Sequence, residues 1–197
     1  MAKPGRKPGS DGEKSRARLL AAAAEEFALN GYHETKISAI VKKAGVSQPA
    51  FYLYFESKEA IFQELTNSFR EQLFAHVQAS LLAPDIQHAS LADAIAAGVA
   101  GIFSFFHEKP QLTHIGLCLS PEAEAIKEEL AKRIQLNLEK EQQMGYFSAD
   151  IDMSMAAESL VGTLVHFGTT LRLQKEPTER AKEFVQLFLN GLMNREG

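Results

Sequence analysis

The sequence predicts an all-α protein of about nine helices, and two patterns carry that prediction. Apolar residues recur three or four positions apart through most of the chain, which is the spacing of one helix face. No β-branched segment of alternating polarity lies between turn residues, so no strand is expected. The 197 residues are 45% hydrophobic. A chain of this length can bury a substantial core in one domain, or in one domain and a small module.

The first predicted helix follows a basic segment. Residues 1–12 are rich in Gly, Pro and Lys/Arg, a composition that cannot bury apolar surface, so we expect a flexible arm there. Ser10 and Glu13 have the spacing of a capping box ahead of an apolar run. Gly31 follows that run, and a glycine at this position allows the helix to end.

Two short helices come next. Thr35 opens the first, which ends at Gly45, and Ser47 opens the second, which runs to about Phe55. Pro49 is tolerated in the first turn of the second helix, because the missing N–H would have no helical partner there.

Six more helices are predicted from their caps and apolar stripes. Their ranges are 57–77, 91–107, 113–119, 120–138, 150–173 and 177–192. Ser57 and Asp150 are the expected N-caps of two of them, and Pro121 lies in the first turn of the helix that Ser120 opens. The clearest stripes are Ile61, Leu65, Phe69, Leu73 and Val77, and then Ile126, Leu130, Ile134 and Leu138.

Charge is distributed unevenly along the chain. The net charge is −4, yet residues 1–60 hold ten Lys/Arg against seven Asp/Glu, and residues 61–197 hold eleven against eighteen. The basic end is where an anionic polymer would dock. Chance asymmetry in a soluble protein explains the same numbers, so a motif must decide between the two.

Residues 35–55 have the plan of a helix-turn-helix. Gly45 can take the positive φ that ends the first helix, Ala44 lets the two helices cross closely, and Val46 fills the gap between them. Apolar residues at positions 37, 40, 41, 46, 51 and 55 are expected to share one interior. The residues left outside on the second helix form a polar and aromatic surface without acids: Ser47, Gln48, Ala50, Tyr52 and Tyr54.

These residues resemble the signature of the TetR/AcrR family of transcriptional regulators. The matching positions are Gly31-Tyr32, Thr35, Ile40, Ala44-Gly45-Val46-Ser47, Tyr52-x-Tyr54-Phe55 and Lys58-Glu59. The resemblance covers roughly residues 15–62. It implies a DNA-binding domain at 13–59 after the arm and a ligand-sensing and dimerisation domain at 60–197. Lys36 and Pro49 stand where the family often has Thr/Ser and Gly, so base preference does not transfer.

The resemblance implies a set of residues that contact double-stranded operator DNA: Thr35, Lys36, Ser47, Gln48, Pro49, Ala50, Tyr52, Tyr54 and Lys58. Gln48 could pair with adenine through two hydrogen bonds, and Pro49 with Ala50 could contact a thymine methyl group. Tyr54 is expected at a base edge, and the phosphate contacts are Tyr52, Thr35, Lys36 and Lys58. The tyrosines could instead pack under the fourth helix as core aromatics.

The basic arm has two interpretations. Its Lys3, Arg6 and Lys7 could enter the neighbouring minor groove, as flexible basic arms do. The alternative is a solvated tail without a role in binding.

The C-terminal portion is expected to hold a cavity for a small, largely apolar effector. By the resemblance, the residues around it are Phe103, Phe106, His107, His114, Cys118, Met144, Phe147, His166 and Phe167. Each could equally be an ordinary core residue. The histidines with Cys118 could instead gather zinc or copper, but their spacing matches no known site, so neither metal nor cofactor is predicted.

The last two helices, 151–173 and 177–192, are expected to form a homodimer interface. They are apolar around much of their circumference, and Gly162, Gly168 and Gly191 allow close approach. The resemblance then implies that two symmetric heads meet a palindromic operator and that ligand favours a dimer whose heads no longer match it. The expected function is a ligand-released repressor.

Two other classes of function remain open at this stage. One is a ligand-independent activator or architectural DNA-binding protein. The other is an all-α enzyme, although the sequence holds no Ser/His/acid motif, phosphate loop or paired metal-ligand motif. We expect a cytoplasmic protein without a membrane partner, because no signal peptide or span of about 20 uninterrupted apolar residues is found and the single Cys118 cannot form an internal disulfide.

Overall fold

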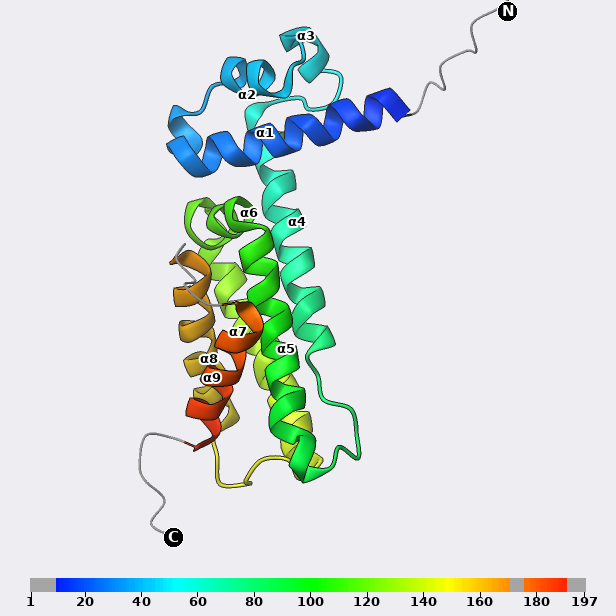
Figure 1. The fold of residues 1–197 in the computed structure, drawn as a ribbon. Helices are drawn as coiled ribbons and strands as arrows, with labels where there is room; N and C mark the ends of the chain where they lie inside the picture. Colours follow the sequence, from blue (N-terminus) through cyan, green and yellow to red (C-terminus); the bar gives the residue numbers. More distant parts are fainter. Residues whose placement is uncertain (1–9, 171–175, 191–197) are drawn as a thin grey trace, which may run out of the picture. The chain divides into compact units, whose positions relative to one another are not determined.

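The computed structural model describes residues 10–170 and 176–190, and every regular element in these residues is a helix (Figure 1). The elements are α1 (Ser10–Glu34), α2 (Ile37–Ala44), α3 (Gln48–Phe51), α4 (Lys58–Ala79), α5 (His88–Glu108), α6 (Pro110–His114), the π-helix η1 (Ile115–Leu119), α7 (Ala123–Gln143), α8 (Met153–Thr169) and α9 (Pro177–Asn190). The all-α prediction is confirmed. The arm residues Lys3, Arg6 and Lys7, with 171–173 and 191–192 of the expected dimer helices, lie outside the described residues.

The chain divides into two compact units between Ser68 and Phe69, within α4. The boundary predicted from the sequence, between residues 59 and 60, lies nine residues earlier. Each unit has a core of its own.

The N-terminal unit is built on aromatic side chains that α1 and α4 bring together. Gly31, with φ 76° and ψ 169°, interrupts the helical path of α1, as expected from a glycine at that position. Beyond it, the ring centres of Tyr32 and Phe62 lie 4.8 Å apart. The Phe62 ring in turn meets the ring of the buried Phe27 edge to face, with 4.9 Å between the ring centres. The edge-to-face geometry adds to the burial energy of these rings.

The C-terminal unit is a helical bundle. Helix α5 packs along α9, and α7 packs along α8 (Figure 1). The predicted α7 stripe is buried at Ile126, Leu130 and Ile134, while Leu138 is half-buried at its end. Asn137 lies on the same helix and donates its amide N–H to the carbonyl of Val77, 2.9 Å away, so α7 is joined to the last turn of α4.

Helix α5 over Ala89–Glu108 is the one described helix whose length and composition would allow a membrane crossing. This differs from the expectation that no segment of the chain is apolar over the length of a membrane span. The core helix of a soluble protein passes the same test, and α5 buries Phe103, Phe105 and Phe106 in the bundle.

Several predicted helix ends were wrong by a few residues. Lys36, not Thr35, is the N-cap residue of α2, and Asp152, not Asp150, caps α8 by accepting the N–H of Ser154 at 2.8 Å. Helix α3 covers four residues, because the chain turns after Phe51.

The predicted helix at 113–119 is α6 followed by a π-turn, in which the N–H of Ser120 bonds to the carbonyl of Ile115 at 2.8 Å. Such turns carry one extra residue per turn and are frequent at functional sites.

Candidate functional sites

The turn between α2 and α3 has the geometry expected of a helix-turn-helix. Gly45 adopts the left-handed conformation, with φ 65° and ψ 38°, which costs most residues but not glycine. Its N–H and that of Val46 bond back to the carbonyls of Lys42 and Val41. Ser47 then caps α3 by accepting the N–H of Ala50 at 3.3 Å. These bonds determine the direction in which α3 leaves the turn.

The predicted interior of this motif is largely confirmed. Ile40, Val41, Phe51 and Phe55 are buried, and Ala44 lies at the crossing of the helices. The two remaining predicted positions, 37 and 46, are half-buried. Burial of these side chains leaves the opposite side of α3 and the following turn exposed.

The exposed side is polar and aromatic, and it holds one leucine. Ser47, Gln48 and Pro49 are exposed, as is Lys36 on the neighbouring helix. Tyr52 is 50% exposed and Leu53 is 81% exposed. Ala50 and Tyr54 are half-buried. No acid lies in residues 47–55.

Leu53 is a candidate that sequence reasoning missed. The sequence predicts a helix that continues to about Phe55, and in such a helix nothing distinguishes this leucine from its polar neighbours. Because α3 ends at Phe51 and residues 52–54 form turns, its side chain points to solvent instead. An exposed leucine can contact thymine methyl groups or sugars.

Two of the predicted phosphate contacts, Thr35 and Lys58, have partners inside the N-terminal unit. Thr35 is 2% exposed, and its hydroxyl bonds to the carbonyls of Glu26 and Gly31 at 3.0 and 2.7 Å. The Lys58 ammonium donates to the carbonyls of Tyr32, His33 and Thr35 at 2.7, 3.2 and 2.9 Å.

Both side chains serve the end of α1. Gly31 interrupts that helix and leaves carbonyls that need partners. An ammonium has three N–H donors, and the three carbonyls accept all three N–H groups of Lys58. The Lys58 ammonium also lies 4.5 Å from the centre of the Tyr32 ring. Sequence position alone could not distinguish this internal role from a contact to phosphate.

Replacing Lys58 by methionine tests this assignment. The variant keeps an apolar stem but leaves three carbonyls without their donor, so we expect it to lose about 1–3 kcal/mol of stability. Thermal unfolding measures the loss, with Lys42→Met, a change at an exposed lysine of α2, as the control. A Lys58→Met variant with unchanged melting but a shallower salt dependence of DNA binding would restore the phosphate role.

The second lysine of α2 is neutralised within the unit. Lys43 pairs with Glu25 at 2.8 Å and Glu26 at 3.1 Å, and hydrogen bonds from these two carboxylates raise the pKa of the Lys43 ammonium. Lys36 and Lys42 are exposed. They are therefore better placed than Lys43 to meet an anion.

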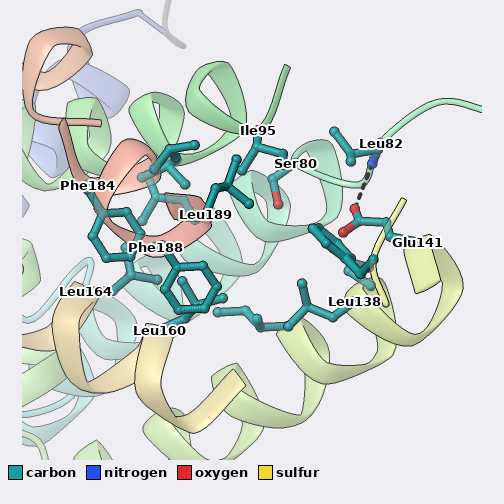
Figure 2. Close-up of a pocket in the computed structure, with 16 residues that line it drawn as sticks. Ser80, Leu82, Ile95, Leu138, Glu141, Leu160, Leu164, Phe184, Phe188 and Leu189 are labelled. Atoms are coloured by element: carbon teal, nitrogen blue, oxygen red, sulfur yellow. Dashed lines mark hydrogen bonds between the residues drawn. The ribbon is translucent and has the colours of Figure 1, made fainter. Parts of the chain in front are cut away.

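The C-terminal unit contains a cavity that is partly open to solvent. Figure 2 shows its walls, which come from α5, α7, α8, α9 and the loops that follow α4 and α7. The apolar lining residues are Leu82, Ile95, Val99, Ile102, Ile134, Leu138, Phe147, Leu160, Leu164, Phe184, Val185, Phe188 and Leu189. The polar lining residues are Ser80, Asn137 and Glu141. Cavities with mostly apolar walls and a few polar groups are typical of small-molecule sites.

The buried acid in this cavity was not anticipated. Glu141 is 5% exposed, and its carboxylate accepts the N–H of Leu82 at 3.0 Å, the dashed line in Figure 2. Burial raises the pKa of the Glu141 carboxyl above its ordinary value, and the bond from Leu82 opposes that rise. Glu141 stands in the charged run EKEQQ, where nothing in the pattern distinguishes it from a solvated acid.

Of the predicted cavity residues, Phe147 lines this cavity and the others do not. Phe103 and Phe106 are core residues, and Phe106 packs so closely on Gly168 that an added Cβ there would lie 3.0 Å from its ring. Phe167 meets Phe103 edge to face at 5.5 Å. His107, Cys118, Met144 and His166 are exposed, and His114 is half-buried.

The correction has a simple physical reason. On α5, the residues that face the cavity are Ile95, Val99 and Ile102, whereas Phe103 and Phe106 face the packed interior. On α9, the apolar residues that form much of the wall are Phe184, Val185, Phe188 and Leu189. The sequence pattern had suggested a dimer interface for this helix instead. No group of three potential metal ligands occurs within residues 10–170 and 176–190.

Known proteins resemble this chain in both of its units. Residues 19–65 match the family model described as bacterial regulatory proteins, tetR family. Over 186 residues the chain is 42% identical to the uncharacterized HTH-type transcriptional regulator YdgC of Bacillus subtilis (strain 168), covering 93% of this chain and 95% of YdgC.

Solved structures share the fold. The TetR family transcriptional regulator PfmR from Thermus thermophilus aligns with a TM-score of 0.75 at 24% identity, covering 90% of this chain and 100% of PfmR. FadR from Bacillus subtilis, crystallised in complex with stearoyl-CoA, aligns with a TM-score of 0.67 at 21% identity, covering 90% of this chain and 99% of FadR.

Proposed function

Because the chain belongs to the TetR family of bacterial regulatory proteins and is a DNA-binding transcriptional regulator, we propose that it is a repressor released from its operator by a small ligand. Its relatives and fold neighbours are transcriptional regulators, so the chain is not an enzyme. We place its action in the cytoplasm, where its DNA is.

One observation carries the DNA-binding part of the proposal. The uncovered side of α3 and of the turn that follows it displays Gln48, Pro49, Tyr52 and Leu53 and no acid, and the Gly45 turn orients it. A surface of this kind suits the major groove, where base edges present donors, acceptors and thymine methyl groups.

We assign the contacts as follows. Gln48 reads a base edge, while Pro49, Ala50 and Leu53 make apolar contacts. Ser47, Lys36, Tyr52 and Tyr54 hold the backbone or neighbouring bases. Phosphate contacts set the register, and base contacts set the sequence preference.

A homodimer would present two such surfaces to a palindromic operator. Exposed apolar side chains on α8 and α9 support this interface: Met155, Leu187 and Phe188, with Gly162 having open space where a Cβ would be. Symmetric reading heads require half-sites about 34–36 Å apart, or one helical turn. Association of α8 and α9 from two chains would set that separation.

The cavity supports the ligand-dependent part. Its walls include α9 and α8, which we assign to the dimer interface, so an occupant would act on the elements that set the separation of the heads. A ligand shifts such an equilibrium by the difference between its affinities for the two states. FadR of Bacillus subtilis, a protein of the same fold, was crystallised in complex with stearoyl-CoA, which supports a ligand with a long apolar chain.

A gel shift tests the proposal. We expect tight binding to a palindrome in the DNA flanking the chain's own gene, and Gln48→Ala should cost about 1–3 kcal/mol of discrimination between that site and altered sites. Gln111→Ala, at an exposed glutamine of the C-terminal unit, is the matched control. Weak binding that is blind to sequence and abolished by salt would contradict the proposal.

A further inference from the structure

The polar end of the cavity is made mainly of hydrogen-bond acceptors. The hydroxyl of Ser80 donates to the carbonyl of Val77 at 2.9 Å, and the amide N–H of Asn137 donates to the same carbonyl at 2.9 Å. These two side chains therefore present mainly oxygen lone pairs, which are hydrogen-bond acceptors, to a bound ligand. Glu141 adds a carboxylate beside them.

That carboxylate has a hydrogen-bond donor but no counter-charge in the described part of the chain. The N–H of Leu82 is its partner at 3.0 Å, and no lysine or arginine pairs with it there. A buried charge is costly unless it is both paired and hydrogen-bonded. Burial accordingly raises the pKa of the Glu141 carboxyl, and a cation bound beside it would reverse that shift.

The surroundings hold the carboxylate in place. The Tyr146 hydroxyl donates to the carbonyl of Ala83 and accepts the N–H of Ile86, both at 2.8 Å, so the loop that carries Leu82 is tied down. A Cβ on Gly98 would lie 2.9 Å from that of Ser80, which shows how tightly α5 approaches this end of the cavity. These contacts hold the loop and the backbone N–H that orients the Glu141 carboxylate.

We infer that the cavity binds an amphipathic amine, with its ammonium group against Glu141, Ser80 and Asn137 and its apolar body against α8 and α9. An ammonium supplies both the missing charge and the donors that these acceptors need. A carboxylate at the same place would meet a like charge. The inference rests on the proposed function, in which this cavity is the effector site.

Calorimetric titration with three ligands of equal chain length tests the head group directly. Decylamine, decanol and decanoate, each kept below its micelle concentration, are titrated into the full-length protein without DNA. Decylamine is protonated at neutral pH, as a lysine side chain is. We expect it to bind at least about tenfold more tightly than decanol or decanoate, because only the ammonium supplies both a positive charge and N–H donors to these acceptors.

A pair of variants locates the effect. Glu141→Gln keeps an acceptor for Leu82 but removes the charge, and it should abolish most of the preference for decylamine. Glu128→Gln removes the same charge from an exposed position of α7 and should leave the preference intact. The inference would be overturned if Glu141→Gln kept the preference for decylamine, or if both variants lost that preference equally. Either result would mean that a cation is attracted to an acidic protein in general.

The ligand series decides the matter even if Glu141→Gln fails to fold. Equal or tighter binding of decanoate by the natural chain, or no binding of any of the three ligands, overturns the inference. Because the titration contains no DNA, a failure of operator binding leaves it unaffected. Operator release by decanoate but not decylamine would uphold the repressor and reject the amine.

Discussion

Replacing Gly116 by alanine is expected to destabilise the C-terminal unit by about 3 kcal/mol, the upper part of the usual range for an overpacked core. Gly116 lies in η1, and a Cβ built on it would overlap Cδ1 and Cγ of the Phe69 ring. Phe69 is fully buried, so its ring cannot turn away into solvent. Either the ring or the π-turn must move.

Chemical denaturation followed by circular dichroism measures this loss. Gly101→Ala is the control, because a Cβ there would lie in ordinary contact, 3.6 Å from Nδ1 of His76, and alanine is the better helix former. Phe69→Ala alone should cost about 3–5 kcal/mol through the cavity it creates. The double variant should be clearly more stable than the sum of the two losses implies. Additive losses would show that the two residues are not in the close contact described.

Replacing Phe27 by alanine is expected to cost the N-terminal unit about 3–5 kcal/mol. The ring is fully buried, meets Phe62 edge to face at 4.9 Å and lies 5.9 Å from Tyr32. Its loss would leave a void between α1 and α4. Because α3 belongs to the same compact unit as this core, operator binding should fall together with stability.

Thermal unfolding and the gel shift are measured on the same preparations. Leu29→Ala, on the same helix at a side chain that is 77% exposed, should stay within about 0.5 kcal/mol of the natural chain. Equal melting of the two variants would show that Phe27 is not a core residue. If the Phe27→Ala variant binds the operator again at low temperature, its defect is one of folding rather than of contact with DNA.

Local rules carried much of the fold prediction. Helix ends depend on bonds between near neighbours, so Ser47, Ser57 and Gly45 were recognised from the residues around them, and the structure confirms their caps and turn. The apolar stripe of α4 was equally clear, since one face of a helix is set by spacing alone, and its five members are buried. The errors at Asp150 and Thr35 are of one or two residues, where a neighbour was equally able to begin the helix.

The candidate sites depend on contacts between distant parts of the chain. Whether Lys58 meets phosphate or the carbonyls of α1 is decided by a segment 23 to 26 residues away, and no local pattern encodes that choice. Leu53 is exposed because the chain turns early after α3 and no element among the described residues covers it. Glu141 lies in a cavity because the loop after α4, some 59 residues earlier, folds over it.

The sequence by itself therefore determined the helices, their order, the helix-turn-helix and the family, because each of these rests on spacing, capping and a contiguous motif. Only the tertiary structure decided which face of α5 turns to the cavity, that α9 forms part of its wall, and that an acid is buried at its polar end. Those outcomes depend on which helices pack together, and the energy of packing is a property of pairs of surfaces that lie far apart in the chain.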